Sequence, residues 1–137
     1  MPANSITIYL SANVDDARLA ELRQVAPHAD LHRFATQEEM ERDIAAAEIV
    51  AGPLSRDAFL RAPRLRWLHS WLAGPNTQLF DELIDSPVAF TCSKGNGAIP
   101  LAEHAMMLML MLNRNAMRWI EAQRARAWDH FLHAELN

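Results

Sequence analysis

Two glycine-bearing segments of the chain combine residue types that suit the binding of a small anion. The first, Ala73-Gly74-Pro75-Asn76, follows a β-rich run, and its glycine lets a ligand approach the backbone closely. The second, Cys92-Ser93-Lys94-Gly95-Asn96-Gly97, follows another such run, and Lys94 adds a positive charge that attracts a carboxylate or a phosphate. Both also have plain structural interpretations, as a Gly-Pro turn and as a loop with a solvated lysine. A third loop, Gly52 to Ser55, either adds a wall to the same edge or only caps a helix through Ser55.

Other groups that often carry chemistry lack the partners that they need. The six histidines show no i, i+4 pair with an intervening glutamate, which marks zinc hydrolases; they are His28, His32, His69, His104, His130 and His133. The single cysteine, Cys92, has no base placed beside it by the sequence. The four glycines, at 52, 74, 95 and 97, cannot form the G-x-G-x-x-G fingerprint of dinucleotide binding. We therefore expect no catalytic, cofactor-binding or metal-binding residue in this chain.

Length and composition indicate one ordinary globular chain. With 137 residues, half of them hydrophobic and 22% charged, the chain can bury a core without disulfides or a metal. A net charge of -4 gives no basic surface for nucleic acid. The single cysteine and the lack of a signal-peptide pattern at the N-terminus favour a cytoplasmic location. The longest apolar run, 105–112, is too short to span a bilayer.

The elements that position the two glycine-bearing segments follow from the alternation of β-rich runs with helical stretches, which is typical of a parallel sheet covered by helices. Asp15 or Asp16, Thr36 with Glu39, and Ser55 are predicted helix caps. Strands are expected at 6–10, 30–34, 48–51, 65–70 and 88–92, and helices at 15–25, 36–47, 55–60 and 77–84. We predict an α/β fold, a flavodoxin-like five-stranded parallel sheet over residues 1–99.

Residues 100–137 are expected to form a helical extension of different character. Pro100 suits a first helical turn, and residues 105–112, AMMLMLML, are apolar around the whole helix. Trp119, Ile120 and Trp128 are expected to continue this apolar surface along a second helix. Such a helix must be covered on every side, and a sheet covers only one. The sequence therefore predicts a homo-oligomer that forms through the Leu101–Leu112 helix.

The order and spacing of four pieces resemble the NAD-dependent D-isomer-specific 2-hydroxyacid dehydrogenases. In that family a strand ends in an Ala-Gly-Val-Asp turn, a short helix and a second strand follow, and a loop then leads to a long helix that opens with Ala-Glu. The matching pieces are Leu65-Arg66-Trp67-Leu68, Ala73-Gly74-Pro75-Asn76, Val88-Ala89-Phe90-Thr91 and Ala102-Glu103-His104. The resemblance is strongest over residues 47–128. It implies the N-terminal substrate domain of such an enzyme without its dinucleotide-binding domain.

The resemblance also implies roles for individual residues. In the family, backbone amides of the turn hold the substrate carboxylate, and the loop after the next strand lines the cleft between domains. The implied substrate-binding residues are therefore Ala73, Gly74, Asn76, Ser93 and Lys94. Pro75 stands where the family has valine and offers no N–H, so one carboxylate contact is in question, and Asn76 replaces the usual aspartate.

Two functions remain open at this stage. The resemblance implies the substrate-binding domain of an oxidoreductase that reduces a 2-oxo acid with NAD, with no hydride transfer by this chain alone. The alternative is a self-associating module without enzymatic activity that binds a small carboxylate or a protein.

Overall fold

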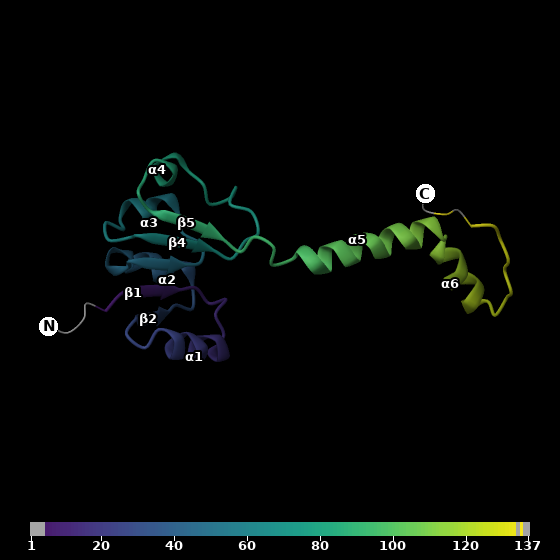
Figure 1. Ribbon diagram of the computed structural model, residues 1–137, viewed down its shortest axis with the longest axis horizontal. Helices are drawn as coiled ribbons and strands as arrows, with labels where there is room; N and C mark the ends of the chain where they lie inside the picture. Colours follow the sequence, from purple (N-terminus) through teal and green to yellow (C-terminus); the bar gives the residue numbers. More distant parts are fainter. Residues whose placement is uncertain (1–4, 134, 136–137) are drawn as a thin grey trace. The chain divides into compact units, whose positions relative to one another are not determined.

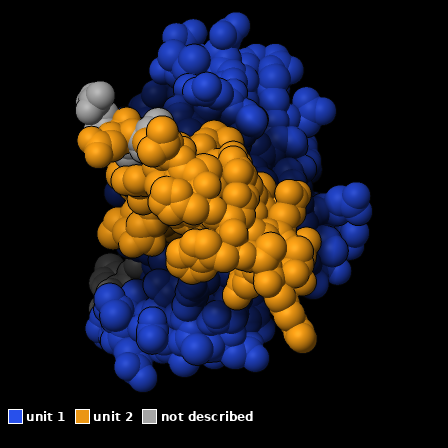
Figure 2. Space-filling view, turned by 90° about the vertical axis from the view of Figure 1, so that its right-hand side faces the viewer, with its two compact units in different colours: residues 1–94 blue, residues 95–137 orange. Residues whose placement is uncertain are grey.

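The computed structural model describes residues 5–133 and 135. The chain forms two compact units, residues 1–94 and 95–137, which are coloured separately in Figure 2. Helix α5 begins two residues before the expected domain boundary at 99/100.

The first unit is built on a five-stranded sheet in the order β2-β1-β3-β4-β5, with every neighbouring pair parallel (Figure 1). The strands are β1 (Thr7–Leu10), β2 (Asp30–Arg33), β3 (Ile49–Ala51), β4 (Trp67–Ser70) and β5 (Ala89–Cys92). This is the flavodoxin-like strand order, so the predicted fold class is confirmed.

Side chains that alternate along the strands fill two cores, one on each face of the sheet. Tyr9 belongs to the larger cluster, together with Met40 of α2 and Leu83 of α4, whereas the next residue, Leu10, packs with Leu19 of α1. Helices α2 (Gln37–Arg42), α3 (Arg56–Leu60) and α4 (Asp81–Ile84) therefore cover one face. Helix α1 (Asp16–Val25) covers part of the other.

The helix caps predicted at Asp15, Thr36 and Ser55 are confirmed, because capping depends on residues close in sequence. The side chains of Asp15, Thr36 and Ser55 accept hydrogen bonds from the backbone N–H groups three residues further on, which begin α1, α2 and α3.

Two helices are shorter than predicted. The helix expected to run to Ala47 ends at Arg42 and is followed by a 3-10 turn, Ile44–Ala46. There the carbonyl oxygen of Asp43 accepts from the Tyr9 hydroxyl and from the backbone N–H of Ala46, as a 3-10 bond requires. The helix expected at 77–84 begins only at Asp81, because Phe80 is extended and its ring packs on Phe59, 5.1 Å between centroids.

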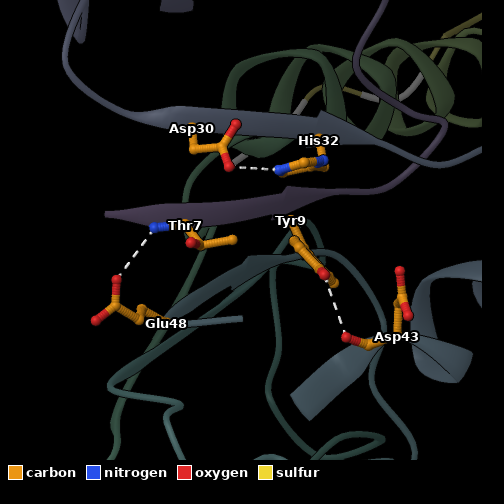
Figure 3. A network of polar contacts seen from close by, with 6 residues as sticks. All are labelled: Thr7, Tyr9, Asp30, His32, Asp43 and Glu48. Atoms are coloured by element: carbon orange, nitrogen blue, oxygen red, sulfur yellow. Dashed lines mark hydrogen bonds and ion pairs between the residues drawn. The ribbon is translucent and has the colours of Figure 1, made fainter. Parts of the chain in front are cut away.

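Strand β1 is tied to its surroundings by polar contacts (Figure 3). The backbone N–H of Thr7 donates to Glu48 at 3.1 Å, and this bond, together with the nearby Arg64, lowers the pKa of the Glu48 carboxyl. The Tyr9 hydroxyl donates to the Asp43 carbonyl at 3.1 Å. Burial, and then the negative charge of Asp43, raise the pKa of Tyr9. Strand β1 is thus tied to its neighbours at its first residue and at Tyr9.

We expect Glu41→Gln to destabilise the first unit by about 1–2 kcal/mol at pH 7. The Glu41 carboxylate accepts from Gln37, and from the backbone N–H and hydroxyl of Ser55 at 2.7 and 2.8 Å, so it joins α2 to the cap of α3. Burial raises the pKa of Glu41, but these hydrogen bonds outweigh it, and the net pKa lies below the usual value.

The destabilisation by Glu41→Gln is expected to depend on pH, because the pKa of Glu41 is lowered in the folded chain. A carboxyl with a lowered pKa stabilises the fold above its unfolded-state pKa, and this contribution is lost as the pH falls through the folded-state value. Urea unfolding at pH 7 and pH 3 measures the difference between wild type and variant, which should shrink at pH 3. Glu38→Gln, an exposed position on the same helix, is the control. A difference that stays constant with pH would contradict the assignment.

The second unit contains two helices, α5 (Ala98–Asn113) and α6 (Ala116–Arg124). Between the two helices, Asn115 adopts a left-handed φ of 49°. No residue of α5 is buried, and its exposed apolar side chains range from Leu108 at 45% to Leu112 at 82%. No helix in the described part of the chain is long and apolar enough to cross a bilayer.

The prediction that Trp128 extends the second helix is wrong. Helix α6 ends at Arg124 because Arg126 adopts a left-handed φ of 51°, and Trp128 lies beyond it, 96% exposed. The following segment is fixed by Arg118, whose guanidinium pairs with Asp129 at 2.5 and 2.7 Å and lies 4.1 Å from the ring centre of Phe131.

Candidate functional site

Within the first unit, the carboxyl ends of β4 and β5 bring the Ala73–Asn76 turn close to residues 92–94, the first half of the second predicted segment. After β5, the backbone N–H of Ser93 donates to the carbonyl oxygens of Ser70 at 3.0 Å and Leu72 at 3.1 Å. The Cys92 thiol lies 3.7 Å from the carbonyl oxygen of Ala73. The start of the turn after β4 therefore lies next to Cys92 and Ser93 at the carboxyl edge of the sheet, the edge at which open parallel sheets bind ligands.

The predicted site residues on the turn are exposed: Ala73, Gly74 and Asn76. Among the described residues, none accepts a hydrogen bond from the backbone N–H groups of these three. Pro75 interrupts this row of donors, and its carbonyl oxygen instead accepts from Gln78 at 2.8 Å. A Cβ at Gly74 would meet nothing within 4 Å, so the space above this backbone is open.

The other two predicted residues contribute side chains. Ser93 is half-buried, and Lys94 is exposed and is the only lysine in the sequence. The turn donors and the Lys94 ammonium are all groups that interact with anions, and neither segment carries a carboxylate.

The structural interpretation of the Gly52–Ser55 loop is confirmed, because Ser55 caps α3. Its other interpretation, as a wall of the anion site, stays a prediction. The loop also adds Pro53 to a small cavity of about 140 Å³ beside the turn. The other residues that line this cavity are Asn13, Ser70, Trp71, Leu72 and Gln78. The buried Oε1 atom of Gln78 has no hydrogen-bond partner in the part of the chain that the structure describes.

The sequence did not reveal a set of polar side chains on β4 and β5 that leads to Ser93. The two ring nitrogens of His69 lie 2.8 Å from the Thr91 hydroxyl oxygen and 3.3 Å from the Ser93 hydroxyl oxygen. The indole N–H of Trp67 donates to the same Thr91 oxygen at 2.8 Å. His69 and Thr91 are paired in register across the two strands, so the set depends on the sheet and is invisible in the linear spacing.

The remaining histidines form no comparable group. In the described ranges, no three His, Cys, Asp or Glu side chains come together in a way that could hold a metal ion. His133 packs against Trp119 at 5.0 Å between ring centres, and His32 pairs with Asp30 on β2.

Comparison with known proteins gives structural neighbours only. No family model matches the sequence, and no curated protein is similar to it by sequence. A D-isomer-specific 2-hydroxyacid dehydrogenase family protein from Aeromonas salmonicida is 23% identical with a TM-score of 0.72, over 96% of this chain and 43% of its own. The D-lactate dehydrogenase from Aquifex aeolicus, solved with NAD and lactic acid, is 16% identical with a TM-score of 0.72. The match covers 93% of this chain and 41% of the Aquifex chain.

A third neighbour is the D-isomer-specific 2-hydroxyacid dehydrogenase from Xanthobacter autotrophicus, solved with NADPH and MES, at 23% identity and a TM-score of 0.67. It is matched over 97% of this chain and 43% of its own. The chain thus spans less than half the length of the dehydrogenases that it matches. The resemblance predicted from the sequence is confirmed at the level of the fold, which is that of one part of a D-isomer-specific 2-hydroxyacid dehydrogenase.

Proposed function

We propose that this chain is the substrate-binding part of a D-2-hydroxyacid dehydrogenase-like protein and holds the carboxylate of a small 2-oxo or 2-hydroxy acid. The observation that carries the proposal is that Ala73, Gly74 and Asn76 are exposed and that their backbone N–H groups have no acceptor among the described residues, at the sheet edge where Ser93 and Lys94 follow β5. The lactic acid named with the Aquifex neighbour is the kind of ligand that these donors suit.

The physical argument rests on charge and on donor number. A carboxylate has two oxygens and accepts about four hydrogen bonds, and bonds to a charged acceptor are about twice as strong as neutral ones. Pro75 removes one backbone donor, so the Ser93 hydroxyl and the Lys94 ammonium carry more of the interaction. On an exposed edge such a site is expected to bind with a Kd on the order of 1–10 mM.

The residues of this chain do not fit a nicotinamide dinucleotide. A pyrophosphate needs a glycine-rich turn between a strand and a helix, and the sequence after Gly97 continues Ala-Ile-Pro without a third glycine. Two of the neighbours were solved with NAD or NADPH, so we propose that NAD belongs to the complete dehydrogenase. This chain alone binds and orients the acid and transfers no hydride.

Titration with pyruvate and D-lactate tests the proposed site. We expect saturable NMR shifts of the Gly74 and Asn76 amides and of the single lysine side chain. Lactamide, which has the same skeleton without the negative charge, is the ligand control.

Two variants separate charge from packing in that titration. Lys94→Ala should weaken pyruvate binding about 3- to 10-fold, and Lys94→Arg, which keeps the charge, by less than that. If lactamide shifts the same amides with equal affinity, or if pyruvate shifts none of them, the proposal is wrong.

A second proposal concerns self-association through α5. The helix is apolar on all sides over residues 105–112 and has no buried residue within the chain. Apolar surface of this kind is normally covered by another protein surface. We propose that the partner is a second copy of the chain, which also agrees with the non-enzymatic alternative of a self-associating module.

A further inference from the structure

The geometry points to a hydrogen-bond chain of fixed direction, Trp67→Thr91→His69→Ser93, which presents the Ser93 hydroxyl as a donor to an oxygen of the bound acid. His69 acts in it as a positioning residue. This inference rests on the proposed function, since it concerns the same carboxylate site.

The direction begins at Trp67, because an indole N–H can only donate. It donates to the Thr91 oxygen at 2.8 Å. A hydroxyl oxygen that accepts a hydrogen bond becomes a better donor, since neighbouring hydrogen bonds polarise one another. The second contact of Thr91 is the Nδ1 atom of His69, also at 2.8 Å. If Thr91 donates to Nδ1, its hydroxyl both accepts one hydrogen bond, from Trp67, and donates one, to His69.

The tautomer of the His69 imidazole follows from this direction. If Nδ1 accepts, the proton of neutral His69 lies on Nε2, because a neutral imidazole has one donor and one acceptor nitrogen. Nε2 lies 3.3 Å from the Ser93 oxygen and donates to it. The ring is held by edge contacts with Trp71, 5.0 Å between centres, and with Trp67 at 6.2 Å. The chain of donors therefore ends on the Ser93 hydroxyl.

The Ser93 hydroxyl, which ends the hydrogen-bond chain, lies close to the proposed carboxylate site. The backbone N–H of Ser93 bonds to the Ser70 and Leu72 carbonyl oxygens, which places the residue where β4 runs into the Ala73–Asn76 turn. With its oxygen accepting from His69, the Ser93 O–H is left to donate. A donor here supplies the kind of contact that Pro75 removes from the turn.

The direction of the chain is tested in the full 137-residue protein without any ligand. Spectra of 15N-histidine-labelled protein near pH 8 report which ring nitrogen carries the proton, and His69→Gln identifies the His69 signals. We expect the Nε2–H tautomer for His69 in the wild type and in Thr91→Ser, and a larger share of the Nδ1–H tautomer in Thr91→Val, where Nδ1 loses its donor. A wild-type Nδ1–H tautomer would overturn the inference.

The consequence for binding is tested with pyruvate as the probe. Thr91→Val should raise the pyruvate Kd about tenfold, the size of one charge-assisted hydrogen bond, while Thr91→Ser should change it less than twofold. Equal affinities in these two variants would overturn the inference and leave the proposed site intact. Failure of wild type to bind any of the acids would overturn the proposed site as well. Because Thr91 is exposed, neither variant is expected to disturb folding.

Discussion

Replacing Leu108 by glutamate is expected to convert a dimer of this chain into a monomer. Leu108 lies in the middle of the α5 segment that is apolar on all sides, and it is 45% exposed in the single chain. In a dimer through α5, the new carboxylate would be taken out of water without a partner, which costs several kcal/mol. A loss of about 3 kcal/mol weakens the dimer more than 100-fold, which is enough to dissociate it at micromolar concentration.

Light scattering or sedimentation at several concentrations measures the mass directly, with 15.5 kDa expected for the monomeric variant. Leu60→Glu is the matched control, because Leu60 on α3 is similarly exposed, at 55%, but lies in the first unit. It should leave the dimer intact. A wild-type chain that remains a monodisperse monomer would show that α5 is not a contact between copies.

The parts of the structure that depend on short-range sequence could be predicted. Asp15, Thr36 and Ser55 cap helices because each bonds to an N–H only three residues away. The strand order followed from the alternation of strands and helices, which leaves few parallel arrangements. The turn at Ala73–Asn76 and the loop at Ser93 and Lys94 were expected at one edge for the same reason.

The features that escaped prediction depend on contacts distant in sequence. The helix at 36–47 is interrupted because the Asp43 carbonyl bonds to Tyr9, 34 residues earlier. The helix at 77–84 lacks its first turn because Phe80 extends toward Phe59. His69 is one of six histidines in the sequence, and only the pairing of β4 with β5 sets it between Thr91 and Ser93.

Replacing Gly52 by alanine is expected to destabilise the first unit by about 2–5 kcal/mol, the combined size of overpacking and backbone strain. Gly52 follows β3 with a φ of 152°, which residues with a side chain rarely adopt. A Cβ there would lie 2.6 Å from the Ser11 Cβ and 2.9 Å from its hydroxyl oxygen. Gly74→Ala is the matched control, because the space around Gly74 is open, and it should change stability by less than about 0.5 kcal/mol.

Displacing Ser11 is also expected to affect the candidate site. The Ser11 hydroxyl accepts from the Trp71 indole N–H at 2.9 Å, and the Trp71 ring packs against His69. Urea unfolding of Gly52→Ala, Ser11→Gly and the double variant separates the two causes. Ser11→Gly alone loses the bond to Trp71, about 1 kcal/mol, but in the double variant it also removes the atoms that the alanine would strike. If crowding dominates, the double variant will be more stable than the sum of the single effects predicts. If the two effects simply add, backbone strain at a φ of 152° accounts for the stability lost in Gly52→Ala. The close approach of Ser11 would then not be the reason that this position requires glycine.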